Sequence, residues 1–211
     1  MMREIDEALR ELLDEHADLP ADVELVFDAP TKDWAAKRSA PTLDLYLYDI
    51  RRDLERDIAG FVDLRDDDGR VTGRRLQPRY FKLSYLVTAW TQRAEDEHHL
   101  LSAALLAFLR YDRIPPELLD GPLAELGGFA PVTIALPPPE DRSFADVWTA
   151  LGGELKPSLD LVVSTPIDVG APEAAGPPTR RATLRARDRA SDDEPEVRAS
   201  NWPSDDDRVP A

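Results

Sequence analysis

The alternating segment from Arg79 to Trp90 constrains the fold of this chain more than any other feature. It is rich in aromatic and β-branched residues, which favour strands. One face of this strand would carry Phe81, Leu83, Tyr85, Val87 and Ala89, and the other Tyr80, Lys82, Ser84, Leu86, Thr88 and Trp90. At about 3.3 Å per residue it would span roughly 35–40 Å, long enough for the centre of a sheet.

Helices and further strands are predicted on both sides of this segment. Apolar residues at helical spacing indicate a first helix of about four turns that ends near Pro20, and a second helix over 94–111. Alternation or short apolar runs predict the strands 23–27, 42–50, 132–136 and 159–165, a hairpin of 61–64 with 71–76, and short helices after Pro115 and over 144–151. This order of elements predicts an α/β domain.

Composition changes at about residue 169. Residues 169–211 have almost no large apolar side chains but many Pro, Arg and Asp. Such a segment cannot bury enough apolar surface to offset its ordering entropy. We therefore expect a folded domain over 1–168 and a disordered, mixed-charge tail over 169–211. The tail holds 7 basic and 9 acidic residues, so most of the net charge of −16 belongs to the folded domain.

The charge and the apolar runs bear on partners and location. A net charge of −16 argues against a phosphate backbone or an anionic membrane as partner, so neither nucleic acid nor membrane is expected. The longest apolar run, near Leu100–Leu109, is about half of the roughly 20 residues that cross a bilayer. The N-terminus lacks the apolar stretch of a signal peptide. A cytoplasmic protein is therefore predicted.

The sequence shows no catalytic, cofactor or metal motif. There is no cysteine, which excludes disulfides and thiolate chemistry. His98 and His99 are adjacent, so their side chains would diverge by about 100° on a helix and could not share a metal ion. The glycine pairs at 127–128 and 152–153 lack the rest of a phosphate-binding loop. We expect no enzyme; the alternative is a soluble enzyme or small-ligand-binding α/β domain with a site not visible in sequence.

Several residues are candidates for an interface. Trp34 could pack under the sheet or anchor a partner, and Tyr46 and Tyr48 could contact a helix or another subunit. The basic block that begins at Arg180 could bind RNA or an acidic surface, or could be a solvated part of the tail. The complete candidate set is Trp34, Tyr46, Tyr48, Arg51, Arg52, Arg180, Arg181 and Arg185.

An ordered series of short motifs carries a family resemblance over roughly residues 3–168. After the first helix these motifs are VFDAPT at 26–31 with Trp34, LYLYDIR at 45–51, LER at 54–56, LSYLVTAW at 83–90, EDEH at 95–98, WTALGG at 148–153 and KPSLDLVV at 156–163. In order and spacing they resemble the tail-terminator or cap family of extracellular contractile injection systems. These are phage-tail-like particles of the virulence-cassette and antifeeding-prophage type.

The resemblance implies a fold, an assembly and partners. The fold would be α/β (α+β) and tail-terminator-like, a mixed, mostly antiparallel sheet of about five strands flanked by two main helices. The protein would form a homo-hexameric ring on the last layer of sheath and inner tube, end their polymerisation and stabilise the extended sheath. It would be assembled in the cytoplasm into a particle that can be released from the cell. The family provides no catalytic residues to transfer.

Overall fold

The computed structural model describes residues 2–137, 143–176, 181–186 and 196–201. The chain divides into two compact units. The first comprises Met1–Val62 and Leu76–Ala171, and the second comprises Asp63–Arg75 and Pro172–Ala211. The first unit contains the central sheet with its helices and therefore every candidate residue before position 169.

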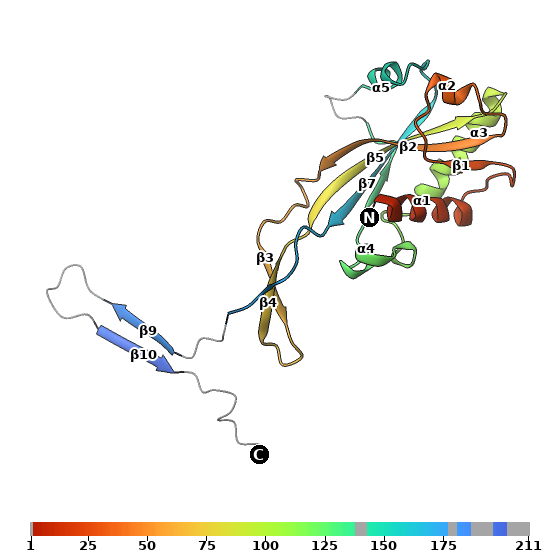
Figure 1. The fold of residues 1–211 in the computed structure, drawn as a ribbon. Coiled ribbons are helices and arrows are strands. Elements are labelled where there is room, and N and C mark those ends of the chain that lie inside the picture. Colours follow the sequence, from red (N-terminus) through yellow and green to blue (C-terminus); the bar gives the residue numbers. More distant parts are fainter. Residues whose placement is uncertain (1, 138–142, 177–180, 187–195, 202–211) are drawn as a thin grey trace. The chain divides into compact units, whose positions relative to one another are not determined.

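The first unit is built on a five-stranded sheet with the order β1-β2-β5-β7-β6 (Figure 1). The strands are β1 (Glu24–Val26), β2 (Thr42–Arg52), β5 (Arg79–Trp90), β7 (Ser158–Ile167) and β6 (Val132–Ile134). Only β1 runs parallel to its neighbour; the other pairings are antiparallel. The prediction of a mixed, mostly antiparallel sheet of about five strands is confirmed, and β5 has the predicted bounds.

A β-bulge interrupts the pairing of β2 with β5. Leu47 lies opposite Tyr85, but Asp49 already lies opposite Ser84, so Tyr48 is the extra residue. Because side chains alternate between faces, the bulge shifts every following residue of β2 to the other face. It therefore explains why the apolar alternation of Leu43, Leu45 and Leu47 stops there.

The two main helices that the resemblance predicts are present, and both cover the same face of the sheet. They are α1 (Met2–His16) and α3 (Ala94–Phe108). Their apolar residues form a single core with the sheet, and its members from α1 are Ile5, Ala8, Leu9, Leu12 and Leu13. The predicted end of α3 at Tyr111 is three residues late, because Leu109 to Tyr111 continue only as single hydrogen-bonded turns.

The remaining elements of the first unit are short. Helix α2 (Lys32–Ala35) precedes β2, the 3-10 turn η1 (Pro116–Leu118) and helix α4 (Gly121–Glu125) follow α3, and α5 (Phe144–Ala150) precedes β7. The side chain of Trp148 on α5 is buried. No described helix combines the length and hydropathy that crossing a membrane needs.

The opposite face of the sheet is covered at the end where β2 begins. Thr42 and Asp44 on β2 are fully buried, as are Leu86 and Thr88 on β5. The alternation of β2 predicts a half-buried strand, so burial of Asp44 differs from the expectation. The segment around α2 accounts for this burial, because the backbone N–H of Asp28 donates to Oδ1 of Asp44 over 3.1 Å.

The second unit consists of strands. Most of β3 (Phe61–Arg65) and β4 (Val71–Leu76) belongs to it, and they are neighbours in a sheet with β8 (Glu173–Ala174). The predicted hairpin position is therefore correct. Strands β9 (Arg181–Ala186) and β10 (Glu196–Asn201) pair antiparallel. The sequence predicts no regular structure after residue 169, so these strands differ from that expectation; main-chain pairing needs no large apolar side chain.

Candidate interaction surface

Trp34 lies beside the start of β2 and is held from several sides. The backbone N–H of Trp34 donates a hydrogen bond to the hydroxyl oxygen of Thr31 over 3.3 Å, and this bond caps α2. The indole Nε1 of Trp34 donates to Oδ2 of Asp28 over 2.8 Å. The guanidinium of Arg38 lies 4.5 Å from its ring centroid and the Trp90 ring packs edge-on at 5.4 Å. Trp34 is half-buried, so it packs against the domain and still presents one side.

Tyr46 and Tyr48 lie in the middle of β2, where the bulge occurs. Both are half-buried. Tyr46 is opposite Leu86 on β5. The hydroxyl of Tyr48 donates a hydrogen bond to Oδ1 of Asp160 on β7 over 2.9 Å. Tyr48 thus joins β2 to a strand that is not its neighbour in the sheet.

The arginine candidates occupy separate places. Arg51 pairs with Asp49 (2.9 Å) and Arg52 pairs with Asp57, both at the end of β2. Arg181 and Arg185 belong to β9, and Arg180 lies outside the described residues. Because Trp34 is at the opposite end of β2 from Arg51 and Arg52, the first unit does not bring its candidates into one site. Their role in an interface stays a prediction.

Lys156 forms a latch that the sequence does not predict. Its Nζ donates to Oε1 of Glu97 (2.6 Å) and to the carbonyl of Ala89 (3.0 Å). The same ammonium lies 4.0 Å from the ring centroid of Trp90. The latch joins the segment before β7 to the end of β5 and the first turn of α3. No sequence signal links Lys156 to Glu97, since the two residues are 59 positions apart and share no motif.

A second unpredicted cluster surrounds Asp53, just after β2. Ser164 Oγ donates to Oδ2 of Asp53 over 2.6 Å, and Arg56 donates to the same oxygen over 2.9 Å. Lys82 Nζ lies 3.7 Å from the other oxygen. Burial opposes ionisation of this carboxyl, but the hydrogen bonds and the cations outweigh it and lower the pKa of Asp53. The cluster therefore contains a buried carboxylate.

Asp44 shows the opposite behaviour on the same sheet. Burial is the main cause that raises the pKa of Asp44, to about 8. The hydrogen bond from the Asp28 N–H lowers the pKa, whereas the negative charge of Asp28 raises it. Asp44 is therefore protonated over most of the neutral range and serves as a buried polar group of the fold.

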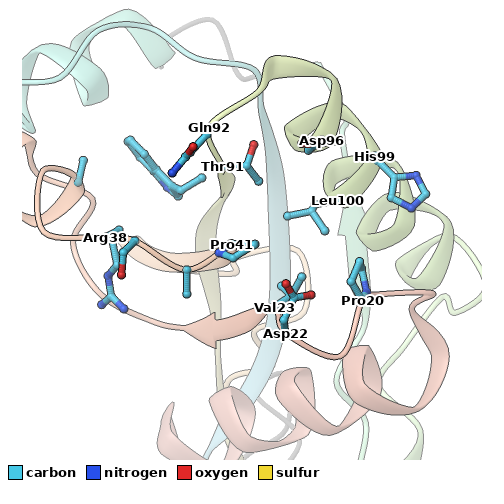
Figure 2. A pocket seen from close by; sticks show the side chains of 14 residues that line it. Pro20, Asp22, Val23, Arg38, Pro41, Thr91, Gln92, Asp96, His99 and Leu100 are labelled. Carbon is cyan, nitrogen blue, oxygen red and sulfur yellow. The ribbon is translucent and has the colours of Figure 1, made fainter.

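A groove of about 450 Å³ opens between the start of β2 and the start of α3 (Figure 2). Asp96 and His99 come from α3, Thr91 and Gln92 from the segment before it, and Arg38 from the segment before β2. Its apolar lining consists of Pro20, Val23, Ala35, Ala40, Pro41 and Leu100, together with the Trp90 ring.

The charges near this groove do not form a metal site. Arg38 is paired with Glu24 (3.0 Å) and Asp28 (2.8 Å) and its side chain is only 25% exposed. Asp22 and Asp96 are the exposed carboxylates of the lining. Across the part of the chain that the structure describes, no three His, Cys, Asp or Glu side chains converge on a metal position. The groove is thus apolar inside with an acidic rim.

A family model and two solved structures are similar to this chain. The family model of the Pvc16 N-terminal domain matches residues 4–181. The fold is similar to the PVC sheath/tube terminator, in its extended state, of an extracellular contractile injection system: TM-score 0.63 and 22% identity over 91% of this chain and 65% of that one. It is also similar to the tube-terminating cap of the anti-feeding prophage: TM-score 0.58 and 22% identity over 83% and 58%.

These similarities have a defined extent. The chain spans less than two thirds of the length of either solved protein. No curated protein sequence matches it. At this identity the solved structures establish a common fold, that of sheath and tube terminators.

Proposed function

The chain belongs to the Pvc16 N-terminal domain family, and from this premise we propose that it is a structural cap of a contractile injection particle. The observation that carries the proposal is the family match over residues 4–181, which includes nearly all of the first unit. The terminator-like fold supports it independently. The resemblance found in the ordered sequence motifs is thereby confirmed.

In the proposed role, copies of the chain form a hexameric ring on the last layer of sheath and inner tube. The ring ends polymerisation and holds the sheath in its extended state. Heterologous contacts, in which one patch of a copy meets a different patch of the next, produce such a ring when the rotation closes. The function is structural and requires no catalytic residue.

The edge strands of the central sheet support contacts with sheath or tube. β1 and β6 are the two edges, and each has only three residues. An edge strand presents backbone N–H and C=O groups to which an extended segment of a partner can pair. The outer side of β6 is already partly paired, because the N–H of Val132 donates to the carbonyl of Asp112 over 3.0 Å. We therefore propose that a sheath or tube segment extends the sheet at β1.

The residues after 168 have a separate place in the proposal. We propose the domain boundary at residue 168 and a mixed-charge appendage after it, whose arginine block meets an acidic surface of the sheath. Deletion of residues 169–211 tests this: the deletion should reduce sheath retention on purified particles. Wild-type particle length together with full sheath retention would refute a role for the appendage.

Electron microscopy of particles made with and without the chain tests the cap itself. Without it, we expect tubes and sheaths of uncontrolled length, or sheaths that contract early. Re-expression of the chain should restore uniform, extended particles, and an antibody label should mark one end only. Uniform extended particles made without the chain would contradict the proposed cap function.

A further inference from the structure

In the connection from β2 to β3, the aspartate side chains are buried and the large apolar side chains are exposed, the reverse of an ordinary surface turn. Its aspartates point inward: the side chain of Asp53 is 0% exposed and that of Asp57 is 5% exposed. Its apolar residues point outward, with Leu54 74% and Ile58 63% exposed. We name this segment, residues 50–61, the inverted turn. Ile50 and Phe61 at its two ends are exposed as well.

Buried ion pairs and hydrogen bonds fix the inverted turn to the sheet. The backbone N–H of Asp53 donates to the carbonyl of Tyr80 over 2.8 Å, and its carboxylate binds Ser164 on β7. Asp57 forms ion pairs with Arg52 and with Arg79, the latter at 3.2 Å. Because these anchors are buried, Leu54 and Ile58 are held outward by the fold.

The exposed apolar side chains of the inverted turn indicate a surface that another molecule covers. Single exposed apolar residues are normal on protein surfaces, but large ones gathered in one ordered connection mark a contact site. Turns are usually made of Gly, Pro, Asn, Asp and Ser, and here the aspartates are used as internal anchors. The inverted turn therefore has the features of a surface for another protein.

The groove beside α3 is complementary to the inverted turn. Its lining is apolar, and its exposed charges are Asp22 and Asp96. The exposed charges of the inverted turn are three cations and one anion: Arg51, Arg52 and Arg56 are 54%, 51% and 38% exposed, and Glu55 is 79% exposed. The inverted turn is thus an apolar projection with a mostly basic rim, and the groove of another copy would offer it an apolar lining with an acidic rim.

We infer that Leu54 and Ile58 of one copy dock in the groove of the next copy. This inference rests on the proposed ring and names its copy-to-copy contact. The two surfaces lie at opposite ends of the β2–β5 ladder, since Thr42 pairs with Trp90 at one end and Arg52 with Phe81 at the other. At about 3.3 Å per residue they are roughly 30 Å apart, too far for a copy to fill its own groove.

Two other contacts of the inverted turn are outcomes of the test. A symmetric contact between two inverted turns would bring Arg52 and Arg56 against their own copies, which like charges disfavour. A contact with sheath alone would leave the groove unoccupied by this chain. Only the head-to-tail contact uses both surfaces in every copy.

Cross-linking of the full chain distinguishes these contacts. The chain has no cysteine, so an introduced pair, Leu54→Cys with Ala40→Cys, is the only target for a short bismaleimide. Ala40 lines the groove. In particles that carry the chain, we expect a ladder of cross-linked copies from the double variant and none from either single variant. Leu109→Cys with Ala40→Cys is the matched control, because Leu109 is also well exposed (62%, against 74% for Leu54) and lies at the far end of α3.

The possible results separate the inference from the proposed function. Capped particles without a ladder would overturn the contact and leave the cap standing. Dimers from Leu54→Cys alone would show a symmetric contact and would also overturn it. A ladder from the concentrated purified chain, together with normal particles in its absence, would support the contact and refute the cap.

Discussion

The hydroxyl of Tyr85 on β5 donates a hydrogen bond to Oδ1 of Asp6 on α1 over 2.8 Å. Tyr85 is fully buried in the main core. Its burial and the adjacent Asp6 raise the pKa of this phenol, so the hydroxyl remains a donor at any working pH. The bond fixes the first helix to the centre of the sheet through a polar contact inside an apolar layer.

Tyr85→Phe should lower the free energy of unfolding by roughly 1–3 kcal/mol, because Asp6 loses its donor where water replaces it poorly. Urea unfolding followed by circular dichroism measures the change. Tyr46→Phe is the matched control, since no described residue hydrogen-bonds to the Tyr46 hydroxyl. Equal effects of the two variants would mean that the Asp6 contact contributes nothing.

Asp44 should make stability fall as pH rises. Its pKa is about 8 in the folded chain, against an ordinary 3.8. Between these values the folded state holds a proton that the unfolded state has released, so the free energy of unfolding decreases with pH. Asp44→Asn should remove this slope. The free energy of unfolding of the variant, relative to that of the parent, should therefore rise from about pH 4 to about pH 8. If the melting temperatures of the parent and of Asp44→Asn change in parallel with pH, the raised pKa of Asp44 is contradicted.

The Lys156 latch should show energetic coupling to Glu97. The two side chains are 21% and 13% exposed, so their 2.6 Å ion pair is largely shielded from water. A double-mutant cycle with Lys156→Met and Glu97→Gln should give a coupling energy of about 0.5–3 kcal/mol. The methionine keeps the stem against Trp90 while removing the charge. If the effects of the two single variants simply add, Lys156 and Glu97 have no coupling energy and the ion pair does not stabilise the fold.

Gly73→Ala should separate β8 from β4. A Cβ at Gly73 would lie 2.9 Å from the backbone oxygen of Glu173, which has no flexible end to move. The N–H of Ala175, which donates to Thr72 over 3.0 Å, should then exchange faster with solvent deuterium. Gly176→Ala is the control, because a Cβ there meets nothing within 4 Å. Unchanged exchange at Ala175 in Gly73→Ala would count against this pairing.

Much of the fold is predictable because periodicity reports local geometry. The bounds of β5 follow from its alternation, and the stripe of α3 gives the helix to within three residues. Periodicity shows which residues share a face but not what covers that face. The burial of Leu86 and Thr88 is therefore invisible in the sequence.

The candidate surface is less predictable because it depends on contacts between distant residues. Lys156 reaches Glu97 and Tyr48 reaches Asp160 only after the strands are in place. The inward direction of Asp53 is not predictable, because it depends on Ser164, which lies 111 residues further along the chain.

The long ladders of β2 with β5, which is broken only at the bulge, and of β5 with β7 have a mechanical consequence. Their interstrand hydrogen bonds are perpendicular to the strands. A tensile load along the strand direction therefore shears all of these bonds together, whereas a load across the strands would open them one after another. Loaded along its strands, the domain resists extension far better than it would if the same pull came from the side.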